Sequence, residues 1–233
     1  MFAVRPQHWS WIDHWCGKIE TQAATCSPNR DQYHQISHMQ KHVDYYLFLI
    51  SPWSYLAINQ VEKIQRKHDL VIHYKPIDVM QTFDKMGGVP PAKRHPSRQR
   101  FRMDELKRWS AYLDVPMNFQ PAHFPTDQSM AAKMVLAAGE SGGRLANACL
   151  TAVWSDEKNI ADESTLTDIA NACGLDAGAL LASAKSDQLA AAFQATTDEA
   201  HERDVFGSPT FVYEGENYWG QDRIEFLDRA LQG

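Results

Sequence analysis

Two patterns of hydrophobic residues predict the first elements of this chain. A dense aliphatic and aromatic run over residues 43–50 ends at a Ser-Pro pair, which is typical of a strand buried on both faces. Pro52 suits the first turn of a helix, because its missing N–H needs no partner there, and apolar residues with helical spacing continue to about His68. Another apolar run over residues 70–77 predicts a second strand. This order predicts a β-α-β unit whose two strands are parallel.

The middle of the chain has helical periodicity and little strand pattern. Gly and Pro interrupt residues 78–96, which predicts a loop. Helices are then expected over residues 97–113, 127–140, 143–155, 164–173 and 176–203, the last with a break. Strand patterns return at residues 210–213 and 217–219, on either side of a Glu-Gly-Glu turn, and a last amphipathic helix is expected over residues 221–231.

The element order β-α-β, helical block, β-β-α predicts an α/β protein with a thioredoxin-like fold and a large helical insertion. We expect the thioredoxin-like domain to comprise residues 43–80 and 205–233, with the inserted helical domain at residues 81–204. Residues 1–42 lack sustained periodicity and are rich in His, Gln and Ser, so they predict a weakly ordered N-terminal extension. Met39 stands just before the first strand, and whether residues 1–38 belong to the native protein stays open.

Composition and charge argue against a membrane protein, a nucleic-acid-binding protein and a metalloprotein. The chain has 233 residues, 44% of them hydrophobic, and no apolar run long enough for a membrane helix, which predicts a soluble protein without a membrane partner. Its net charge of -6 gives no basic footprint for nucleic acid. The four cysteines and the scattered histidines have no metal-ligand spacing, so we expect no metal and a reducing, cytoplasmic location. Cys149 and Cys173 fall in apolar helical patterns and are expected to be buried packing residues.

The stretch Ser51-Pro52-Trp53-Ser54 raises a chemical question, because its two serines stand where many redox proteins carry two cysteines. A residue between a buried strand and a helix lies beside unpaired backbone N–H groups, which favour a nearby anion. Serine is also among the best helix N-cap residues, so an ordinary cap would explain Ser51 alone. With no second thiol at Ser54, dithiol-disulfide exchange is excluded at this position.

Two further segments bear on this position. Ser208-Pro209 directly precedes the predicted hairpin, where thioredoxin-like folds place a cis proline opposite the first helix, and an ordinary turn is the alternative. Such a proline leaves the backbone edge of Ser208 free to pair with an extended peptide. Gln221 and Asp222 begin the last helix, where N–H groups can hold a carboxylate and Asp222 can pair with an ammonium, although an acidic residue in a first helical turn is common.

Several motifs in order give the chain a family resemblance. The segments SPWSYL, YKPID, GGVPPAKR, ELKRWSAYLDVP, FGSPTFV and YWGQDRIEFL resemble the 2-hydroxychromene-2-carboxylate isomerase family, relatives of kappa-class glutathione transferases and DsbA-type oxidoreductases. The likeness covers residues 43–233. It implies glutathione as cofactor, with Ser51 as the catalytic residue beside the glutathione sulfur. The implied glutathione-binding residues are Ser51, Pro52, Trp53, Val89, Ser208, Pro209, Trp219, Gly220, Gln221 and Asp222.

The resemblance also implies a reaction and a substrate site. The reaction is the interconversion of 2-hydroxychromene-2-carboxylate and trans-o-hydroxybenzylidenepyruvate in aromatic catabolism. The implied substrate-binding residues are Phe83, Lys93, Arg94 and Phe124; Phe83 and Phe124 replace a lysine and a tyrosine of one family member, and solvated basic side chains would equally explain Lys93 and Arg94. A homodimer is implied by relatives. A kappa-class glutathione transferase and a non-catalytic thioredoxin-like binding module stay open as alternatives.

Overall fold

A computed structural model describes residues 40–233, so the predicted extension lies almost entirely outside the described residues. Its mixed sheet contains β1 (His42–Leu47), β2 (Val71–Pro76), β3 (Thr210–Tyr213) and β4 (Glu216–Trp219) in the order β2-β1-β3-β4. Strands β1 and β2 are parallel, whereas β3 pairs antiparallel with both β1 and β4. The predicted β-α-β unit and the C-terminal hairpin are therefore confirmed.

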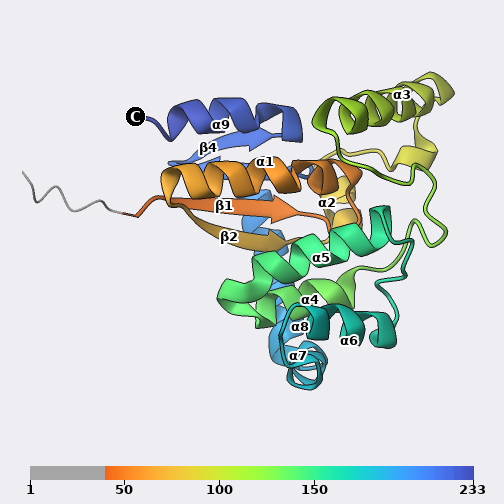
Figure 1. Ribbon diagram of the computed structural model, residues 1–233, viewed down its shortest axis with the longest axis vertical. Coiled ribbons are helices and arrows are strands. Elements are labelled where there is room, and N and C mark those ends of the chain that lie inside the picture. Colours follow the sequence, from red (N-terminus) through yellow and green to blue (C-terminus); the bar gives the residue numbers. More distant parts are fainter. Residues whose placement is uncertain (1–39) are drawn as a thin grey trace, which may run out of the picture. The chain divides into compact units, whose positions relative to one another are not determined.

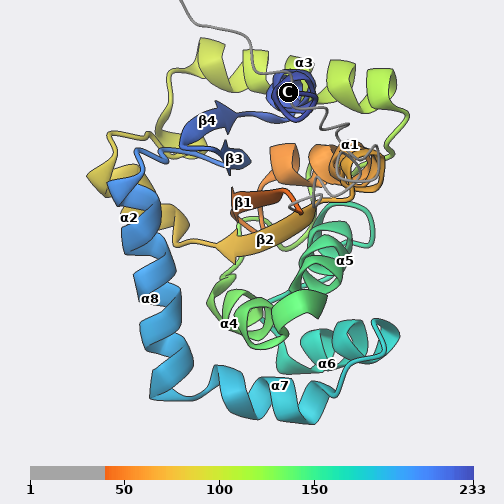
Figure 2. The ribbon, with the colours of Figure 1, turned by 90° about the vertical axis from the view of Figure 1, so that its left-hand side faces the viewer.

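The long helices fall into two groups (Figures 1 and 2). Helices α1 (Pro52–His68), α3 (Pro96–Leu113) and α9 (Ile224–Ala230) lie in the upper part of both views. The remaining long helices lie in the lower part of both views, nearer to β2 than to β4: α4 (Ser129–Ala137), α5 (Gly142–Trp154), α6 (Glu163–Ala172), α7 (Ala177–Ala184) and α8 (Asp187–Glu202). The predicted break within residues 176–203 is the short link between α7 and α8. Helix α1 packs against both α3 and α5 and so joins the two groups.

The core fills both sides of β1. Tyr45, Tyr46 and Leu47 are almost fully buried, and Phe211 of β3 stacks on Tyr45 with ring centroids 4.5 Å apart. Leu56 of α1 is also fully buried. Burial of side chains from both faces explains why this strand has a continuous apolar run rather than alternation.

Two sequence predictions need correction. Residues 78–96 are not all loop, because α2 (Val79–Lys85) begins there, capped by Asp78, whose Oδ1 accepts from Met80 N and Gln81 N at 2.9 and 2.8 Å. A short 3-10 turn, Pro91–Lys93, follows. Strand β1 ends at Leu47 instead of residue 50, since Phe48 N and Leu49 N donate to the side chains of Ser208 and Gln128 rather than to a neighbouring strand.

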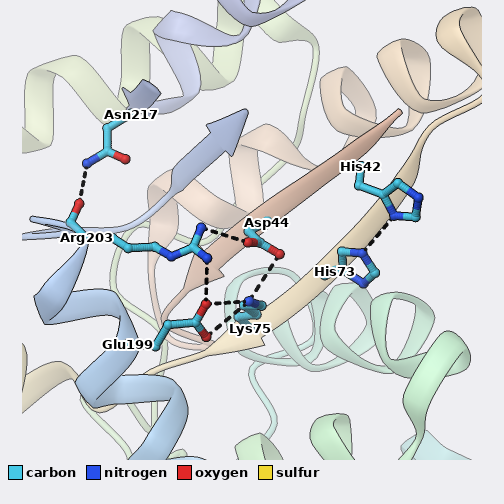
Figure 3. Close-up of polar contacts among 7 residues, drawn as sticks. All are labelled: His42, Asp44, His73, Lys75, Glu199, Arg203 and Asn217. Atoms are coloured by element: carbon cyan, nitrogen blue, oxygen red, sulfur yellow. Dashed lines mark hydrogen bonds and ion pairs between the residues drawn. The ribbon is translucent and has the colours of Figure 1, made fainter. Parts of the chain in front are cut away.

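A network of charged side chains joins the sheet to the end of α8 (Figure 3). Lys75 Nζ of β2 lies 3.1 Å from Asp44 Oδ1 of β1 and 2.9 Å from Glu199 Oε1 of α8. Arg203 contacts the same two carboxylates at 3.1 Å each, and its carbonyl accepts from Asn217 Nδ2 at 2.7 Å. Alternating charges that share partners are worth more than isolated surface pairs. The network therefore fixes the chain just before it enters the Ser208-Pro209 loop.

Replacing Lys75 with Met should lower the free energy of unfolding at pH 7 by about 2 kcal/mol, because two partly buried carboxylates lose their shared donor. Burial raises the pKa of Glu199, but hydrogen bonds from Lys75 and Tyr46 and the charges of Lys75 and Arg203 together outweigh it, so the net pKa lies below its ordinary 4.5. Such a group stabilises the fold above its unfolded pKa and loses that contribution as pH falls through the folded value. The variant should therefore lose less stability than the parent protein between about pH 5 and 3.

Urea unfolding across this pH range measures both effects. Lys185→Met is the matched control, because Lys185 pairs with Glu163 where both side chains are about half exposed, at 51% and 53%. It should change stability little at any pH. Equal effects of the two substitutions would show that the network has no special weight.

Candidate functional site

Ser51 lies where β1 turns into α1. It is the N-cap of that helix, with extended backbone angles, and its Oγ accepts from Ser54 N at 3.2 Å. The ordinary N-cap interpretation is thus confirmed. The same hydroxyl also donates to the Ser208 carbonyl at 3.4 Å, across 157 residues of sequence. Ser51 therefore caps α1 and at the same time faces the proline loop.

The first turn of α1 keeps a free donor beside Ser51. Pro52 has no N–H, and within residues 40–233 Trp53 N–H has no acceptor. Pro52 is buried and Trp53 is half-buried against the core. Free N–H groups at the start of a 17-residue helix carry partial positive charge and favour an anion there. This end of α1 can stabilise a negatively charged atom placed next to the Ser51 hydroxyl.

Ser208 and Pro209 form the loop opposite α1. Their peptide bond is cis, as predicted from the fold. Among the described residues, neither the N–H nor the carbonyl of Ser208 bonds to another backbone group, so the backbone edge is free as expected. The Ser208 side chain, in contrast, has two partners: its Oγ accepts from Phe48 N at 2.8 Å and lies 2.7 Å from Ser54 Oγ. Ser54 is fully buried, so its hydroxyl holds the loop and does not reach solvent.

Residues at the end of β4, Trp219 and Gly220, pack against the Ser208-Pro209 loop. A Cβ on Gly207 would lie 2.6 Å from Trp219 Nε1, which shows how tightly Trp219 packs on the loop. The Trp219 ring remains 52% exposed and meets Phe206 edge-on at 4.7 Å. Gly220 has a φ of 106° and donates from its N–H to the Pro209 carbonyl at 2.8 Å. Trp219 and Gly220 are thus joined directly to the proline loop, as the sequence interpretation requires.

Gln221 and Asp222 follow in a 3-10 turn, Gln221–Arg223, that precedes α9. Gln221 is 3% exposed and accepts from Gln60 Nε2 of α1 at 3.4 Å. Asp222 is exposed, and its carboxylate pairs with Arg223 at 2.7 Å. The two residues therefore differ in how accessible they are to a ligand. Gln221 is buried and joins the C-terminal segment to α1, whereas Asp222 faces solvent and can exchange Arg223 for another cation.

The predicted substrate residues come from three segments of the chain: Phe83 from α2, Lys93 and Arg94 from the turn that follows it, and Phe124 from the loop between α3 and α4. Phe83 of α2 packs edge-on against Phe48 at 5.8 Å, next to the turn that leads to Ser51. In the following loop, Val89 is 42% exposed and its carbonyl accepts from Arg94 Nε at 2.7 Å. Lys93 is exposed in the short 3-10 turn.

Phe124 lies in the loop between α3 and α4. It packs against Trp154 of α5 at 4.9 Å, and it precedes a second cis proline, Pro125. A separate surface pocket of about 400 Å³ is lined by none of the predicted site residues; its walls are Pro116, Met117, Asn118, Phe119 and Ser155. Tyr55 of α1 touches this wall, because its hydroxyl donates to the Pro116 carbonyl at 2.6 Å.

Gln128 supports the site and was not identified from the sequence. It is 4% exposed; its Oε1 accepts from Leu49 N at 2.6 Å and its Nε2 donates to the Ile77 carbonyl at 2.7 Å. The side chain thereby joins the turn before Ser51 to the end of β2. A single glutamine ahead of a helix carries no sequence signal for such a contact, because both partners are backbone groups 51 to 79 residues away.

A family model of the DSBA-like thioredoxin domain matches residues 42–232. The chain belongs to the DSBA-like thioredoxin family. Within it, the chain is 30% identical to a 2-hydroxychromene-2-carboxylate isomerase of Sphingobium xenophagum over 194 residues, covering 83% of this chain and 99% of that protein. It is 22% identical to a glutathione S-transferase kappa 1 of Caenorhabditis elegans, covering 82% and 90% of the two chains.

A solved 2-hydroxychromene-2-carboxylate isomerase gives the structural comparison. It superposes on this DSBA-like protein with a TM-score of 0.73 at 27% identity, covering 82% of this chain and 94% of the other. The isomerase family and the thioredoxin-like fold with a helical insertion, both expected from the sequence motifs, are confirmed. The relatives support an isomerase-like or glutathione-transferase-like enzyme.

Gln128→Ala should lower the free energy of unfolding by about 2–4 kcal/mol, because it leaves a buried N–H and a buried carbonyl unpaired. Gln128→Glu is the informative second variant. It keeps an acceptor for Leu49 N, but it places an oxygen next to the Ile77 carbonyl, and that oxygen can donate to the carbonyl only when the carboxyl is protonated. Chemical denaturation should order stability as parent, Gln128→Glu, Gln128→Ala at pH low enough to protonate the new carboxyl. An alanine variant as stable as the parent would contradict the bridging role.

Proposed function

We propose that this protein is a glutathione-dependent isomerase that interconverts 2-hydroxychromene-2-carboxylate and trans-o-hydroxybenzylidenepyruvate, or close aromatic analogues. The observation that supports it best is the double role of Ser51, which caps α1 while its hydroxyl faces the free backbone edge of Ser208. The names of the relatives support the same reaction. Within residues 40–233, the two cysteines, Cys149 and Cys173, are buried and are not used in this proposal.

The residues around Ser51 fit glutathione by their chemistry. Within residues 40–233 the Ser208 N–H has no partner and its carbonyl accepts only the long, 3.4 Å bond from Ser51 Oγ, so this backbone edge suits the cysteinyl part of a peptide. Asp222 is exposed and can pair with the ammonium of the γ-glutamyl group. The walls of the glutathione site would be formed by Pro52, Trp53, Trp219 and Gly220. Gln221, which precedes Asp222 and contacts Gln60 of α1, would hold this turn in place. Val89 would contribute only apolar or backbone contacts.

Bound glutathione would supply a thiolate that adds reversibly to a conjugated double bond and so permits rotation about it. The protein's part is to hold and activate that thiol. A thiol has an ordinary pKa near 8.5, and a helix N-terminus lowers the pKa by favouring the charged form. Ser51 Oγ–H can turn from its long, 3.4 Å contact with the Ser208 carbonyl towards the sulfur, because it gives up only a weak bond. Its Oγ can still accept from Ser54 N while it does so.

Ser51→Ala should reduce kcat/KM for isomerisation about 100-fold and move the pH dependence of the rate to higher pH, because the thiolate loses one donor. The assay follows the absorbance of the substrate at constant glutathione. Ser186→Ala is a matched control: Ser186 is the N-cap of α8, accepts from Leu189 N at 3.3 Å, and lies outside the site. It should cost similar stability, about 1 kcal/mol, without any effect on the rate.

An unchanged rate and pH profile in Ser51→Ala would reduce Ser51 to an ordinary helix cap. Two alternatives give different signals in the same preparation. A kappa-class transferase, favoured by the kappa relative, would consume free thiol in proportion to product. A non-catalytic binding module would show no turnover, and absence of calorimetric glutathione binding at millimolar concentration would overturn both enzyme proposals.

Cys149→Ser should leave kcat and KM unchanged, because Cys149 is fully buried in α5 and takes no part in the proposed chemistry. Burial raises the pKa of its thiol to about 12, so it has no thiolate character at neutral pH. The variant should be less stable by about 1–2 kcal/mol, since a hydroxyl replaces a thiol among apolar neighbours. Steady-state kinetics on the folded variant is the measurement, and a large fall in kcat would contradict this assignment.

A further inference from the structure

A strongly basic segment interrupts an otherwise acidic chain. The protein carries a net charge of -6, yet residues 93–108 contain seven Lys or Arg residues and only two acids, Asp104 and Glu105. Of the seven, Arg108 is neutralised by Glu105 at 2.5 Å. The others form no ion pair with a carboxylate of residues 40–233. Positive charge is therefore concentrated here without internal compensation.

Three of these residues are brought together by the fold. Arg98 and Arg102 stand four residues apart on one face of α3. Arg94 precedes the helix and is docked on it, because Gln99 Nε2 donates to the Arg94 carbonyl at 2.8 Å and to the Ala92 carbonyl at 3.1 Å. Arg94 Nε is in turn held by the Val89 carbonyl at 2.7 Å. Arg94 is thereby fixed beside the first turn of α3, close enough to Arg98 and Arg102 for their positive charges to act on one another.

The proximity of these groups is unfavourable without a ligand. Burial lowers the pKa of Arg94, and the positive charge of Arg98 lowers it further. Burial likewise lowers the pKa of Arg102, and Arg94 adds to the effect. Each of the two is partly withdrawn from water, yet the one hydrogen bond of the Arg102 side chain within residues 40–233 goes to the sulfur of Met103 at 3.9 Å. A guanidinium that loses water without gaining an anion destabilises the fold, which points to an anionic partner that comes from outside.

We propose that Arg94, Arg98 and Arg102 bind a small aromatic ligand that carries two acidic groups. Three planar cations match more than one carboxylate, and guanidinium groups bind carboxylates through paired, charge-assisted hydrogen bonds. In Figure 1 the segment between α2 and α3 lies at the end of the sheet where β1 stops and α1 begins. The proposal rests on the proposed function in one respect: the ligand is the isomerase substrate, distinguished by a second acidic substituent.

Binding of phthalate and benzoate to the full-length protein, measured by calorimetry without glutathione, tests this site apart from turnover. Both probes carry one aromatic ring, and at pH 8 they carry two and one carboxylates. Phthalate should bind at least about tenfold more tightly, and Arg98→Ala and Arg102→Ala should each remove about tenfold of that affinity, the effect of one charge-assisted hydrogen bond. Arg100→Ala is the matched control, an exposed arginine on another face of α3.

Thermal melting separates a binding role from a structural one. Removal of one of three mutually repelling cations should leave the melting temperature of the ligand-free protein unchanged or raise it, as is common where a site is built at the expense of stability. Phthalate should raise the melting temperature of the parent and of Arg100→Ala, but not of Arg98→Ala or Arg102→Ala. Equal affinity for both probes, or equal loss in Arg100→Ala, would overturn the proposal. If glutathione fails to bind while phthalate binds as described, only the proposed isomerase chemistry is lost.

Discussion

The contact between Ser208 and the beginning of α1 is the interaction on which the site depends. The Ser208 hydroxyl forms hydrogen bonds with Phe48 N and Ser54 Oγ, two groups about 160 residues away in sequence. The Ser208 carbonyl accepts from Ser51 Oγ. Almost the entire insertion is therefore contained in one closed loop. Because the entropic cost of closing a loop grows only slowly with its length, a few well-satisfied buried hydrogen bonds suffice to hold it.

The same contact explains how the backbone of α1 is made available to a ligand. Phe48 N and Leu49 N leave the sheet and bind side chains of Ser208 and Gln128, so β1 stops at Leu47 and the chain turns at once into the helix. Ser51 N then donates to the Phe48 carbonyl at 3.0 Å, which closes the turn. Side chains satisfy the groups that would otherwise continue the strand, whereas the N–H of Trp53 has no acceptor within residues 40–233. The insertion contributes Gln128 to this turn, so it supports the site as well as covering it.

The sequence indicated most of the fold because the fold is built from long periodic segments. The strands around Tyr45 and Phe211 and the helices of the insertion have clear apolar spacing, and their burial confirms it. Helix α2 was not predicted because its seven residues contain less than two full turns of hydrophobic periodicity, and Gly87 and Gly88 follow closely. The end of β1 and the role of Gln128 depend on contacts between side chains and distant backbone, which no local pattern encodes. The motifs placed Ser51, Ser208 and Trp219 in one neighbourhood, whereas no pattern indicated that Phe124 packs on Trp154.

Two separate sources of positive charge bear on the proposed site: backbone N–H groups at the start of α1 and arginine side chains near α3. The positive field at the start of α1 comes from backbone N–H groups, so it is fixed by the fold and does not depend on which substrate is used. Attraction of an acidic aromatic substrate is a separate problem, because a chain of net charge -6 repels anions at long range. Arginines in the loop before α3 and on α3 itself form no ion pair with a carboxylate of residues 40–233, apart from Arg108, and this segment supplies none of the hydrogen bonds of Ser51 and Ser208. On the proposed function, activation of the thiol and recognition of the acidic substrate would therefore come from different segments of the chain.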